Sequence, residues 1–379
     1  MKALLVLEDG TTLHGEGFGA EGETFGEMVF NTGMTGYQET LTDPSYCRQI
    51  VAMTAPHIGN TGVNSDDPES DRVWVSGYVV REPSPAASSW RATGELGDYL
   101  AASGVPGIAV RGTRLLTRRV REAGAMRAAI STAELDPARL LARVRTSPEM
   151  TGADLAREVS TPSPYVVHAT GQPRYRVTAV DLGIKAATPR AMAARGCEVL
   201  VLPATATAAD ILRTDPDGVF FSNGPGDPAA TGYAVDAMRG VLDAGLPLFG
   251  ICLGSQILAL ALGLRTYKLR YGHRGVNQPV MDVRSRRVYI TSHNHGFAAA
   301  APDGLRDGGT DTGTGAGEPF ETPYGPAVVS HVNLNDGVVE GLRMLERPVF
   351  SVQYHPEAAP GPHDAADHFD AFCAAMGRR

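Results

Sequence analysis

The feature that most constrains the fold is a strict alternation of short apolar runs and helical patterns between residues 176 and 262. Near-continuous apolar strands separated by helices indicate a parallel sheet covered on both faces. Ligands of such sheets bind beyond the carboxyl ends of the strands, so we expect the chemistry in the loops after Ser222 and Ile251. The four strand–helix pairs are 176–181 with 186–195, 199–202 with 208–213, 219–222 with 229–244, and 247–251 with 254–262.

The rest of the chain predicts a second domain, because 379 residues exceed the usual size of one domain, about 150 residues, more than twofold. Strand-like runs crowd the first 80 residues and helical patterns follow at 95–102, 113–123 and 137–145, which indicates a mixed α+β domain. A segment with three prolines and no periodicity reads as a linker. We therefore predict an N-terminal domain (1–155), a linker (156–175) and an α/β domain (176–379) that ends in short strands at 283–290, 328–331, 338–345 and 349–353.

Charge and cysteine usage exclude several classes of protein. The net charge of −8 argues against a generic binder of nucleic acid or of anionic membranes, since both favour a basic surface. The four cysteines stand far apart, which disfavours a zinc ribbon and a small disulfide scaffold. The longest apolar run, 257–264, is too short to span a bilayer, and the first residues do not read as a secretory signal. We expect a cytoplasmic protein with reduced thiols.

The sharpest local signal is the run Gly250-Ile-Cys-Leu-Gly254, which lies between an apolar strand and a helix. It fits the strand–turn–helix elbow that exposes a nucleophile, with Cys252 in that position and glycines where side chains would collide. The positive end of the helix dipole favours the thiolate, and the backbone N–H of Leu253 would face a developing oxyanion. A buried core cysteine is the alternative, and we keep that interpretation for Cys47, Cys197 and Cys373.

A thiolate nucleophile needs a base, and His355-Pro-Glu357 at the end of the strand 349–353 is the best candidate. Residues two apart in an extended chain point the same way, so Glu357 could orient the ring of His355. His293 and His295 are rival bases. Their H-x-H spacing also suggests a metal site, but no third ligand of clear spacing follows, so no metal is predicted.

A second loop, Ser222-Asn-Gly-Pro-Gly-Asp-Pro228, also follows a strand and opens a helix, with Asp227 as N-cap and Pro228 at the first helical position. Its match to a dinucleotide fingerprint is discounted, because the loop follows the third strand of its sheet and its prolines remove N–H donors. Its backbone amides more plausibly complete an oxyanion hole. Two further features receive no function: a basic cluster (Arg114, Arg118, Arg119, Arg121) and a glycine-rich loop at 303–317.

These motifs resemble the class I, triad-type glutamine amidotransferases. The C-terminal half carries Asn223-Gly-Pro-Gly-Asp-Pro228, Gly250-Ile-Cys-Leu-Gly-Ser-Gln256 and His355-Pro-Glu357. Several other runs are similar to the small (glutaminase) chains of carbamoyl-phosphate synthase. They are Phe30-Asn-Thr-Gly-Met-Thr-Gly-Tyr-Gln-Glu39, Leu41-Thr-Asp-Pro-Ser-Tyr46, Pro56-His-Ile-Gly-Asn60, Asn294-His-Gly-Phe297 and Pro360-Gly-Pro-His-Asp364.

The resemblance implies an N-terminal domain that contributes to partner docking and to the glutamine site. It also implies that a flavodoxin-like parallel-sheet amidotransferase domain follows it in the chain. It implies Cys252 as nucleophile, with His355 and Glu357 completing the triad. It also implies a large synthetase partner that carries ATP, Mg²⁺ and bicarbonate, with no cofactor in this chain. The positions matching L-glutamine ligands are Ser45, Gly224, Gly226, Leu253, Gln256, Asn294, Gly296 and Phe297.

Two other functions stay open at this stage. One is a free-standing cysteine hydrolase of γ-glutamyl bonds, which would leave the first 150 residues without a role. The other is a catalytically silent assembly module, which the intact triad disfavours. The sequence departs from the family at Ser255, a position that is often His, and in its longer glycine-rich loop.

Overall fold

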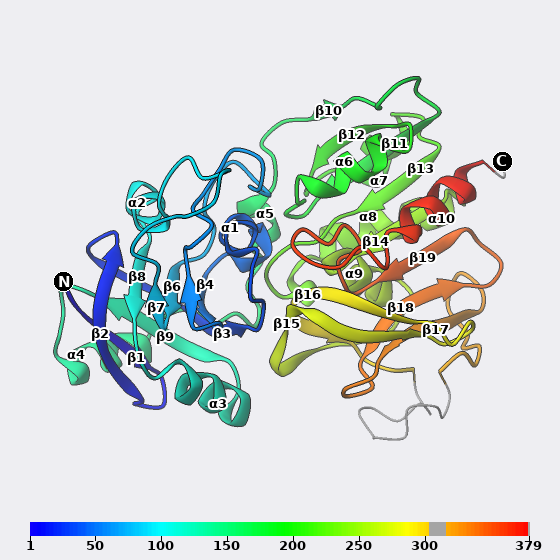
Figure 1. Ribbon diagram of the computed structural model, residues 1–379. Helices are drawn as coiled ribbons and strands as arrows, with labels where there is room; N and C mark the ends of the chain where they lie inside the picture. The colour runs from blue at the N-terminus through cyan, green and yellow to red at the C-terminus, as the bar shows by residue number, and fades with distance from the viewer. Residues whose placement is uncertain (303–315, 378–379) are drawn as a thin grey trace. The chain divides into compact units, whose positions relative to one another are not determined.

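The computed structural model describes residues 1–302 and 316–377 of the chain (Figure 1). Contacts between Cα atoms divide the chain into two compact units, one of residues 1–151 with 270–275 and the other of residues 152–269 with 276–379. Apart from Ala316 and Gly317, the glycine-rich loop expected at 303–317 lies outside the described residues. The two units are described separately below.

The first unit is built on a closed barrel of seven strands, in the order β1-β2-β8-β6-β4-β3-β9. Its closure pairs strands far apart in sequence, with Leu4 of β1 opposite Ser131 of β9. Four helices accompany the barrel: α1 (Tyr37–Thr42), α2 (Leu96–Ala102), α3 (Thr113–Ala123) and α4 (Pro137–Val144). The barrel strands are β1 (Lys2–Leu7), β2 (Thr12–Gly19), β3 (Glu23–Asn31), β4 (Gln49–Met53), β6 (Gly77–Val80), β8 (Pro106–Ala109) and β9 (Met126–Ser131).

Among its described residues, the second unit contains a ten-stranded sheet whose parallel part runs β12-β11-β13-β14-β19. Numbered along the chain, this is the order 2-1-3-4-5 of flavodoxin-like folds, so the predicted fold class is confirmed. The parallel strands are β11 (Tyr175–Asp181), β12 (Cys197–Pro203), β13 (Gly218–Phe221), β14 (Leu248–Ile251) and β19 (Val349–Val352). The sheet continues through β18 (Val339–Met344), β17 (Ala327–Asn333), β15 (Thr266–Asp282) and β16 (Val288–Ala299).

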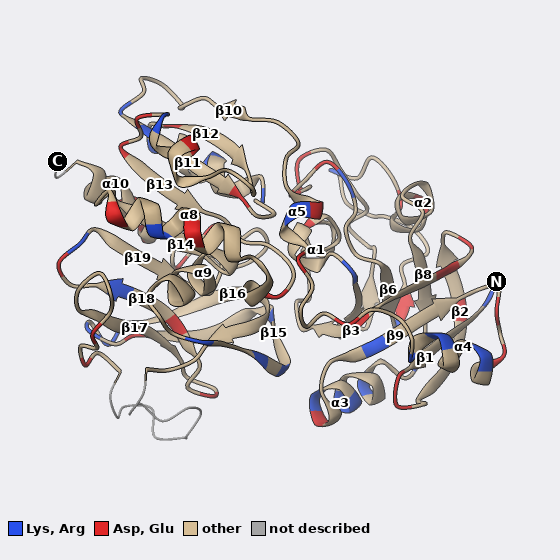
Figure 2. Cartoon of the chain, turned by 180° about the vertical axis from the view of Figure 1, so that it is seen from behind, with Lys and Arg blue, Asp and Glu red and all other residues tan. Residues whose placement is uncertain are grey.

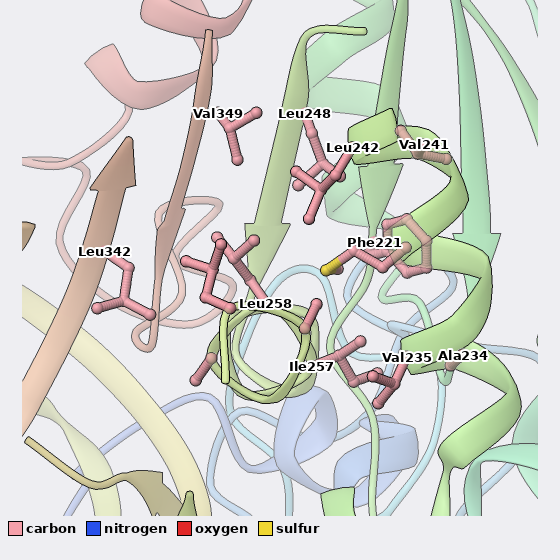
Figure 3. Packing of buried hydrophobic residues seen from close by; sticks show 14 of the residues in the cluster. Phe221, Ala234, Val235, Val241, Leu242, Leu248, Ile257, Leu258, Leu342 and Val349 are labelled. Atoms are coloured by element: carbon pink, nitrogen blue, oxygen red, sulfur yellow. The ribbon is translucent and has the colours of Figure 1, made fainter. Parts of the chain in front are cut away.

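Helices cover both faces of this sheet, as the apolar strands predict. One core joins the sheet to α7 (Ala208–Leu212), α8 (Gly232–Asp243) and α9 (Leu253–Ala261). The opposite core joins it to α6 (Ala187–Ala193) and α10 (Asp367–Met376). In Figure 3, Ile257 of α9 points toward Val235 of α8, while Leu258 lies on the side of Leu248 and Leu342. The helix that follows Cys252 is therefore held by apolar packing along its length.

Three local expectations differ from the structure. A strand was expected at 283–290, but β16 starts only at Val288, because the Asp282 carboxylate accepts hydrogen bonds from the backbone N–H groups of Arg284 and Ser285 and closes a turn. The expected linker 156–175 contains α5 (Ala156–Val159) and β10 (Tyr165–Val167), which pairs antiparallel with β12. The helix α10 was not predicted.

Two basic residues of α3 form ion pairs with acidic residues of the same unit. In Figure 2 the positions of the basic residues on α3 are coloured blue. Arg118 pairs with Glu122 and Arg119 pairs with Asp9, both in the same unit. This pairing agrees with a solvated helix face. Across the described ranges, no helix has both the length and the apolar character that a membrane crossing requires.

The packing of α8 against α7 generates a stability prediction. A Cβ added at Gly240 of α8 would stand 2.3 Å from the Cβ of Ala208, so Gly240→Ala forces the two helices apart. We expect it to lower the free energy of unfolding by about 1–3 kcal/mol, the usual cost of overpacking. Gly232, in the first turn of the same helix, faces open space, and Gly232→Ala should stay within about 0.5 kcal/mol. Urea unfolding of both variants is the measurement, and equal stabilities would contradict the packing described here.

Candidate active site

The turn between β14 and α9 places Cys252 in a strained conformation. Cys252 has φ of 54° and ψ of −104°, a backbone conformation that residues other than glycine rarely adopt. It lies at the N-cap of α9. A Cβ at Gly250 would lie 2.7 Å from the carbonyl oxygen of Gly254, and one at Gly254 would lie 2.2 Å from that of Phe221. Glycine is thus required at both positions because a side chain would collide with nearby backbone, as the elbow pattern predicts.

The structure brings His355 and Glu357 to this turn. The backbone N–H of His355 donates to the carbonyl oxygen of Ser292 over 2.9 Å, and Nδ1 of the ring lies 2.7 Å from Oε1 of Glu357. The thiol of Cys252 lies 3.7 Å from the carbonyl oxygen of Asn294 and is close enough to the ring of His355 to act on its protonation. No hydrogen bond of standard geometry reaches Nε2 of His355 within the described part of the chain. That nitrogen therefore remains for the thiol and for reacting groups.

A third charged residue, Lys185, completes a buried chain of charges that sequence reasoning missed. Its Nζ lies 3.1 Å from Oε1 of Glu357, and the side chains of both residues are almost wholly inaccessible to water. Lys185 follows β11 at the carboxyl edge of the sheet, where a flavodoxin-like fold gathers its site. Its signal in the sequence is weak, because one lysine after a strand has no spacing that relates it to the other two residues.

This charge chain explains the protonation states of the site. Burial by itself raises the pKa of Glu357, but Lys185 and His355 outweigh burial and lower that pKa to about 2. Burial likewise lowers the pKa of His355, and Lys185 acts in the same direction. The Glu357 carboxylate and the nearby thiol prevail and raise the pKa of His355 to about 10. At neutral pH the site therefore holds an imidazolium ring beside the sulfur of Cys252.

The loop after β13 approaches the same turn from the other side. A Cβ at Gly224 would lie 2.9 Å from Cδ2 of Leu253 and 2.0 Å from the carbonyl oxygen of Leu182, so only glycine fits there. Gly226 has φ of +93°, and the N–H of the next residue, Asp227, donates to the carbonyl oxygen of Ala153. Leu253 lies in the first turn of α9, where backbone N–H groups have no intrahelical acceptor. This end of the helix can stabilise an anionic oxygen.

Most of the residues expected to bind substrate converge in the second unit. Nε2 of Gln256 donates to the carbonyl oxygen of Phe297 over 2.7 Å and to Oε1 of Gln353 over 3.0 Å. Asn294, Gly296 and Phe297 follow one another on β16, and the carbonyl of Asn294 faces the thiol of Cys252. Asn294 thus contacts the nucleophile, and Gln256 is joined to the same strand through the carbonyl group of Phe297.

Ser45, the remaining residue expected to bind substrate, belongs to the first unit. It lies in the short 3-10 helix η1 (Pro44–Tyr46), where its backbone N–H donates to the Asp43 carboxylate over 2.9 Å. This capping fixes the orientation of the Ser45 backbone. Its part in binding stays a prediction.

The rival bases, His293 and His295, form a separate buried cluster. Nδ1 of His293 lies 3.2 Å from Nε2 of His295 and 3.7 Å from a carboxylate oxygen of Glu340. Within the second unit, these are the described residues whose ligand atoms converge closely enough to hold a metal ion. Sequence reasoning missed Glu340, because it lies on β18 at a spacing that no metal motif predicts. His355 is the imidazole that pairs with Glu357 and interacts with the thiol of Cys252.

Comparison with known protein families identifies two matching domains. Residues 5–130 match the model described as carbamoyl-phosphate synthase small chain, CPSase domain, and residues 178–375 match glutamine amidotransferase class-I. A carbamoyl phosphate synthase small chain of Streptomyces coelicolor is 59% identical over 99% of this chain and 96% of its own length. Small chains of Bifidobacterium longum and Mycobacterium tuberculosis are each 55% identical over 99% of this chain, covering 94% and 98% of their own lengths.

The buried charge chain generates a prediction that can be measured by unfolding. Removing one partner of a buried ion pair leaves an uncompensated charge, so Lys185→Met and Glu357→Gln should each destabilise the protein by about 3–5 kcal/mol. The double variant should lose less than the sum, by a coupling of about 0.5–3 kcal/mol. Urea unfolding at neutral pH measures the cycle, with Lys2→Met, at an exposed position, as the control. Additive losses would contradict direct pairing.

The effect of these variants on the free energy of unfolding should depend on pH. The pKa of Glu357 is lowered to about 2, so its contribution to stability is present above its ordinary value of 4.5 and lost as the pH falls toward 2. The pKa of His355 is raised to about 10, so its contribution is present below 6.5 and lost as the pH rises toward 10. The stability difference between the unmodified protein and the double variant should therefore be largest between about pH 4.5 and 6.5. A difference that grows outside this window would overturn the assignment of charges.

Proposed function

The chain belongs to the family of carbamoyl-phosphate synthase small chains, and from this membership we propose that it is a glutaminase subunit that hydrolyses L-glutamine through a thioester on Cys252. The ammonia released is delivered to a large synthetase subunit, which forms carbamoyl phosphate. The observation that carries this proposal is the strained Cys252 turn beside the His355–Glu357 pair, within an amidotransferase domain.

The first half of the reaction forms the thioester. The thiolate of Cys252 attacks the carbon of the glutamine side-chain amide, and the amide oxygen becomes an oxyanion. The backbone N–H of Leu253 faces this oxygen, and Gly224, packed against Leu253, is the second candidate donor. His355, held as imidazolium by Glu357, gives its proton to the departing nitrogen, so that ammonia leaves and a glutamyl thioester remains.

The second half releases glutamate. His355 has lost its proton and acts as a base toward a water molecule, which attacks the thioester carbon. The second oxyanion forms at the same position and collapses with loss of the Cys252 thiolate. Glu357 keeps Nδ1 of His355 bonded throughout, so that Nε2 is the nitrogen that exchanges protons with the sulfur, the amide and the water. Lys185 keeps Glu357 ionised during both halves.

Glutamine binding is assigned to residues around the nucleophile. Gln256, Asn294, Gly296 and Phe297 come from α9 and β16, which the Gln256–Phe297 hydrogen bond joins. Gly224, Gly226 and Leu253 supply backbone groups at the helix end, and Ser45 of the first unit is proposed as the remaining contact. Polar backbone and amide groups of this kind recognise an amide and an α-amino acid without a metal ion.

The proposal extends to the partner and to the pathway. The large subunit would carry the sites for ATP, Mg²⁺ and bicarbonate, and this chain would need no cofactor, because thioester chemistry requires a nucleophile, an acid–base group and oxyanion donors. The two chains would form a heterodimer in the cytoplasm that serves arginine and pyrimidine synthesis. The first unit, matched by the small-chain model, is proposed to dock the partner.

The nucleophile assignment generates the first functional prediction. In a complex with the large subunit, Cys252→Ser should abolish glutamine-driven carbamoyl phosphate synthesis, because a serine hydroxyl beside an imidazolium is a far weaker nucleophile. Synthesis driven by added ammonia should continue, because that route bypasses the glutaminase site. The two rates are measured on one preparation, with Cys47→Ser as the matched control at another buried cysteine. Glutamine-driven synthesis that survives in Cys252→Ser would contradict the mechanism.

The subunit role generates a second prediction. The glutaminase turnover of the isolated chain should be slow and should rise at least tenfold when the large subunit is added, since delivery of ammonia is useful only in the complex. Steady-state glutamate release with and without the partner is the measurement. A turnover that is fast alone and indifferent to the partner would instead support a free-standing hydrolase of γ-glutamyl bonds.

A further inference from the structure

Two cysteines that the proposed mechanism does not use lie in contact on the side of the sheet covered by α10. Cys197 opens β12 and is fully buried, while Cys373 lies in the last turns of α10 and is partly accessible to water. Their sulfur atoms are 3.7 Å apart, although 176 positions separate them in sequence. Both thiols are free in the structure.

Contacts between the start of β12 and helix α10 hold the two sulfur atoms in place. Nε of Arg195, two residues before Cys197, donates to Oδ1 of Asp370 over 2.7 Å, and Nη2 donates to the carbonyl oxygen of Ala366 over 3.1 Å. Arg195 thereby ties the start of β12 to the first turn of α10. On the inner face of the same helix, Phe372 and Met376 are buried in the core. The two sulfur atoms therefore meet as part of a packed helix–sheet contact.

The surroundings make the two thiols chemically unequal. The hydrogen-bond contact with Cys197 lowers the pKa of Cys373. Burial and the Asp370 carboxylate oppose this effect, and the guanidinium groups of Arg195 and Arg174 add to it. The same hydrogen bond, together with burial, raises the pKa of Cys197. The pKa is therefore lowered at the more accessible sulfur, that of Cys373, and raised at the buried sulfur of Cys197. Redox-sensing cysteines share this arrangement, an accessible low-pKa thiol beside a resolving thiol.

We propose that Cys373 and Cys197 form a peroxide-reactive dithiol that closes to a reversible disulfide. Cys373 is the attacking thiolate and Cys197 the resolving thiol. The oxidant is hydrogen peroxide, and the reductant that reopens the bond is a small thiol. This site is separate from the proposed glutamine chemistry and does not depend on it.

The reaction proceeds in two balanced steps. The Cys373 thiolate attacks one oxygen of the peroxide, so that an S–O bond forms, the O–O bond breaks and hydroxide leaves; the product is a sulfenic acid. The sulfur of Cys197 then attacks the sulfur of Cys373, an S–S bond forms and the S–O bond breaks. The departing hydroxide takes the proton of the Cys197 thiol, and the first hydroxide takes a proton from solvent. Overall, two thiols are oxidised and one peroxide is reduced to two waters.

Closure requires a short movement. A disulfide has an S–S length of about 2.0 Å, so the two sulfur atoms must approach by roughly 1.7 Å from their present 3.7 Å. The bond would fasten the C-terminal helix to the first residue of β12 and close a very long loop of chain, which restricts the unfolded state. The oxidised protein should therefore melt several degrees above the reduced one.

The test uses the full chain with Cys252→Ser, so that oxidation of the proposed nucleophile does not interfere. The protein is treated with hydrogen peroxide at one to five equivalents and digested without reduction, and the peptides are identified by mass spectrometry. We expect a cross-linked pair containing Cys197 and Cys373 in most chains, lost on treatment with dithiothreitol, together with the rise in melting temperature. Cys47, which is buried elsewhere, should stay reduced and serves as the internal control.

Two further variants in the same background separate the roles of the thiols. Cys197→Ser should leave Cys373 as a sulfenic acid that dimedone traps, and Cys373→Ser should leave Cys197 unmodified. Arg195→Met should slow the oxidation of Cys373 several-fold at neutral pH and less at high pH, where the thiolate forms without help. The proposal is overturned if the cross-link does not form while Cys373 becomes overoxidised, or if Cys373 reacts no faster than Cys47.

Discussion

The pairing of the Glu357 carboxylate with His355 and Lys185 is the interaction on which the proposed active site depends. Each of these side chains is buried, and burial alone opposes the charged forms of His355 and Glu357. Their charges persist because each one lies within hydrogen-bond distance of an opposite charge. Such an arrangement costs desolvation energy that a hydrophobic core would not, so its presence is better explained by chemistry than by stability.

The apolar scaffold makes this charge chain possible by fixing where its members come from. Lys185 follows β11, Cys252 follows β14, and His355 and Glu357 follow β19. All three strands are parallel and belong to one sheet, so their carboxyl ends meet at the same edge. The packing of α9 against α8 and the strands (Figure 3) then holds the strained backbone of Cys252 in place. The same unit places two of its cysteines in different surroundings. Cys252 lies beside an imidazolium, and Cys373 lies beside an arginine and a second thiol.

The sequence was sufficient to predict the strand–helix alternation and its sheet, because apolar periodicity reports burial directly. The elbow at Cys252 was recognisable, because glycines at both flanking positions reflect backbone contacts of one short turn. Lys185 and Glu340 could not be found, since each meets its partners through pairing of strands distant in sequence. The closure of the barrel, the antiparallel strand β10 and the turn at 283–287 were missed for related reasons: the first two are set by long-range register, and the turn by the single side chain of Asp282.

The most direct measurement of the central claim is the titration of His355 by ¹⁵N nuclear magnetic resonance on protein labelled at histidine, with the signal assigned from His355→Gln. If Glu357 holds this ring as described, both ring nitrogens should keep the chemical shifts of an imidazolium from pH 6 to about pH 9, with deprotonation near the pKa of about 10. A ring that loses its proton near pH 6.5 or below would show that burial prevails over the carboxylate, and would contradict the account of how this site works.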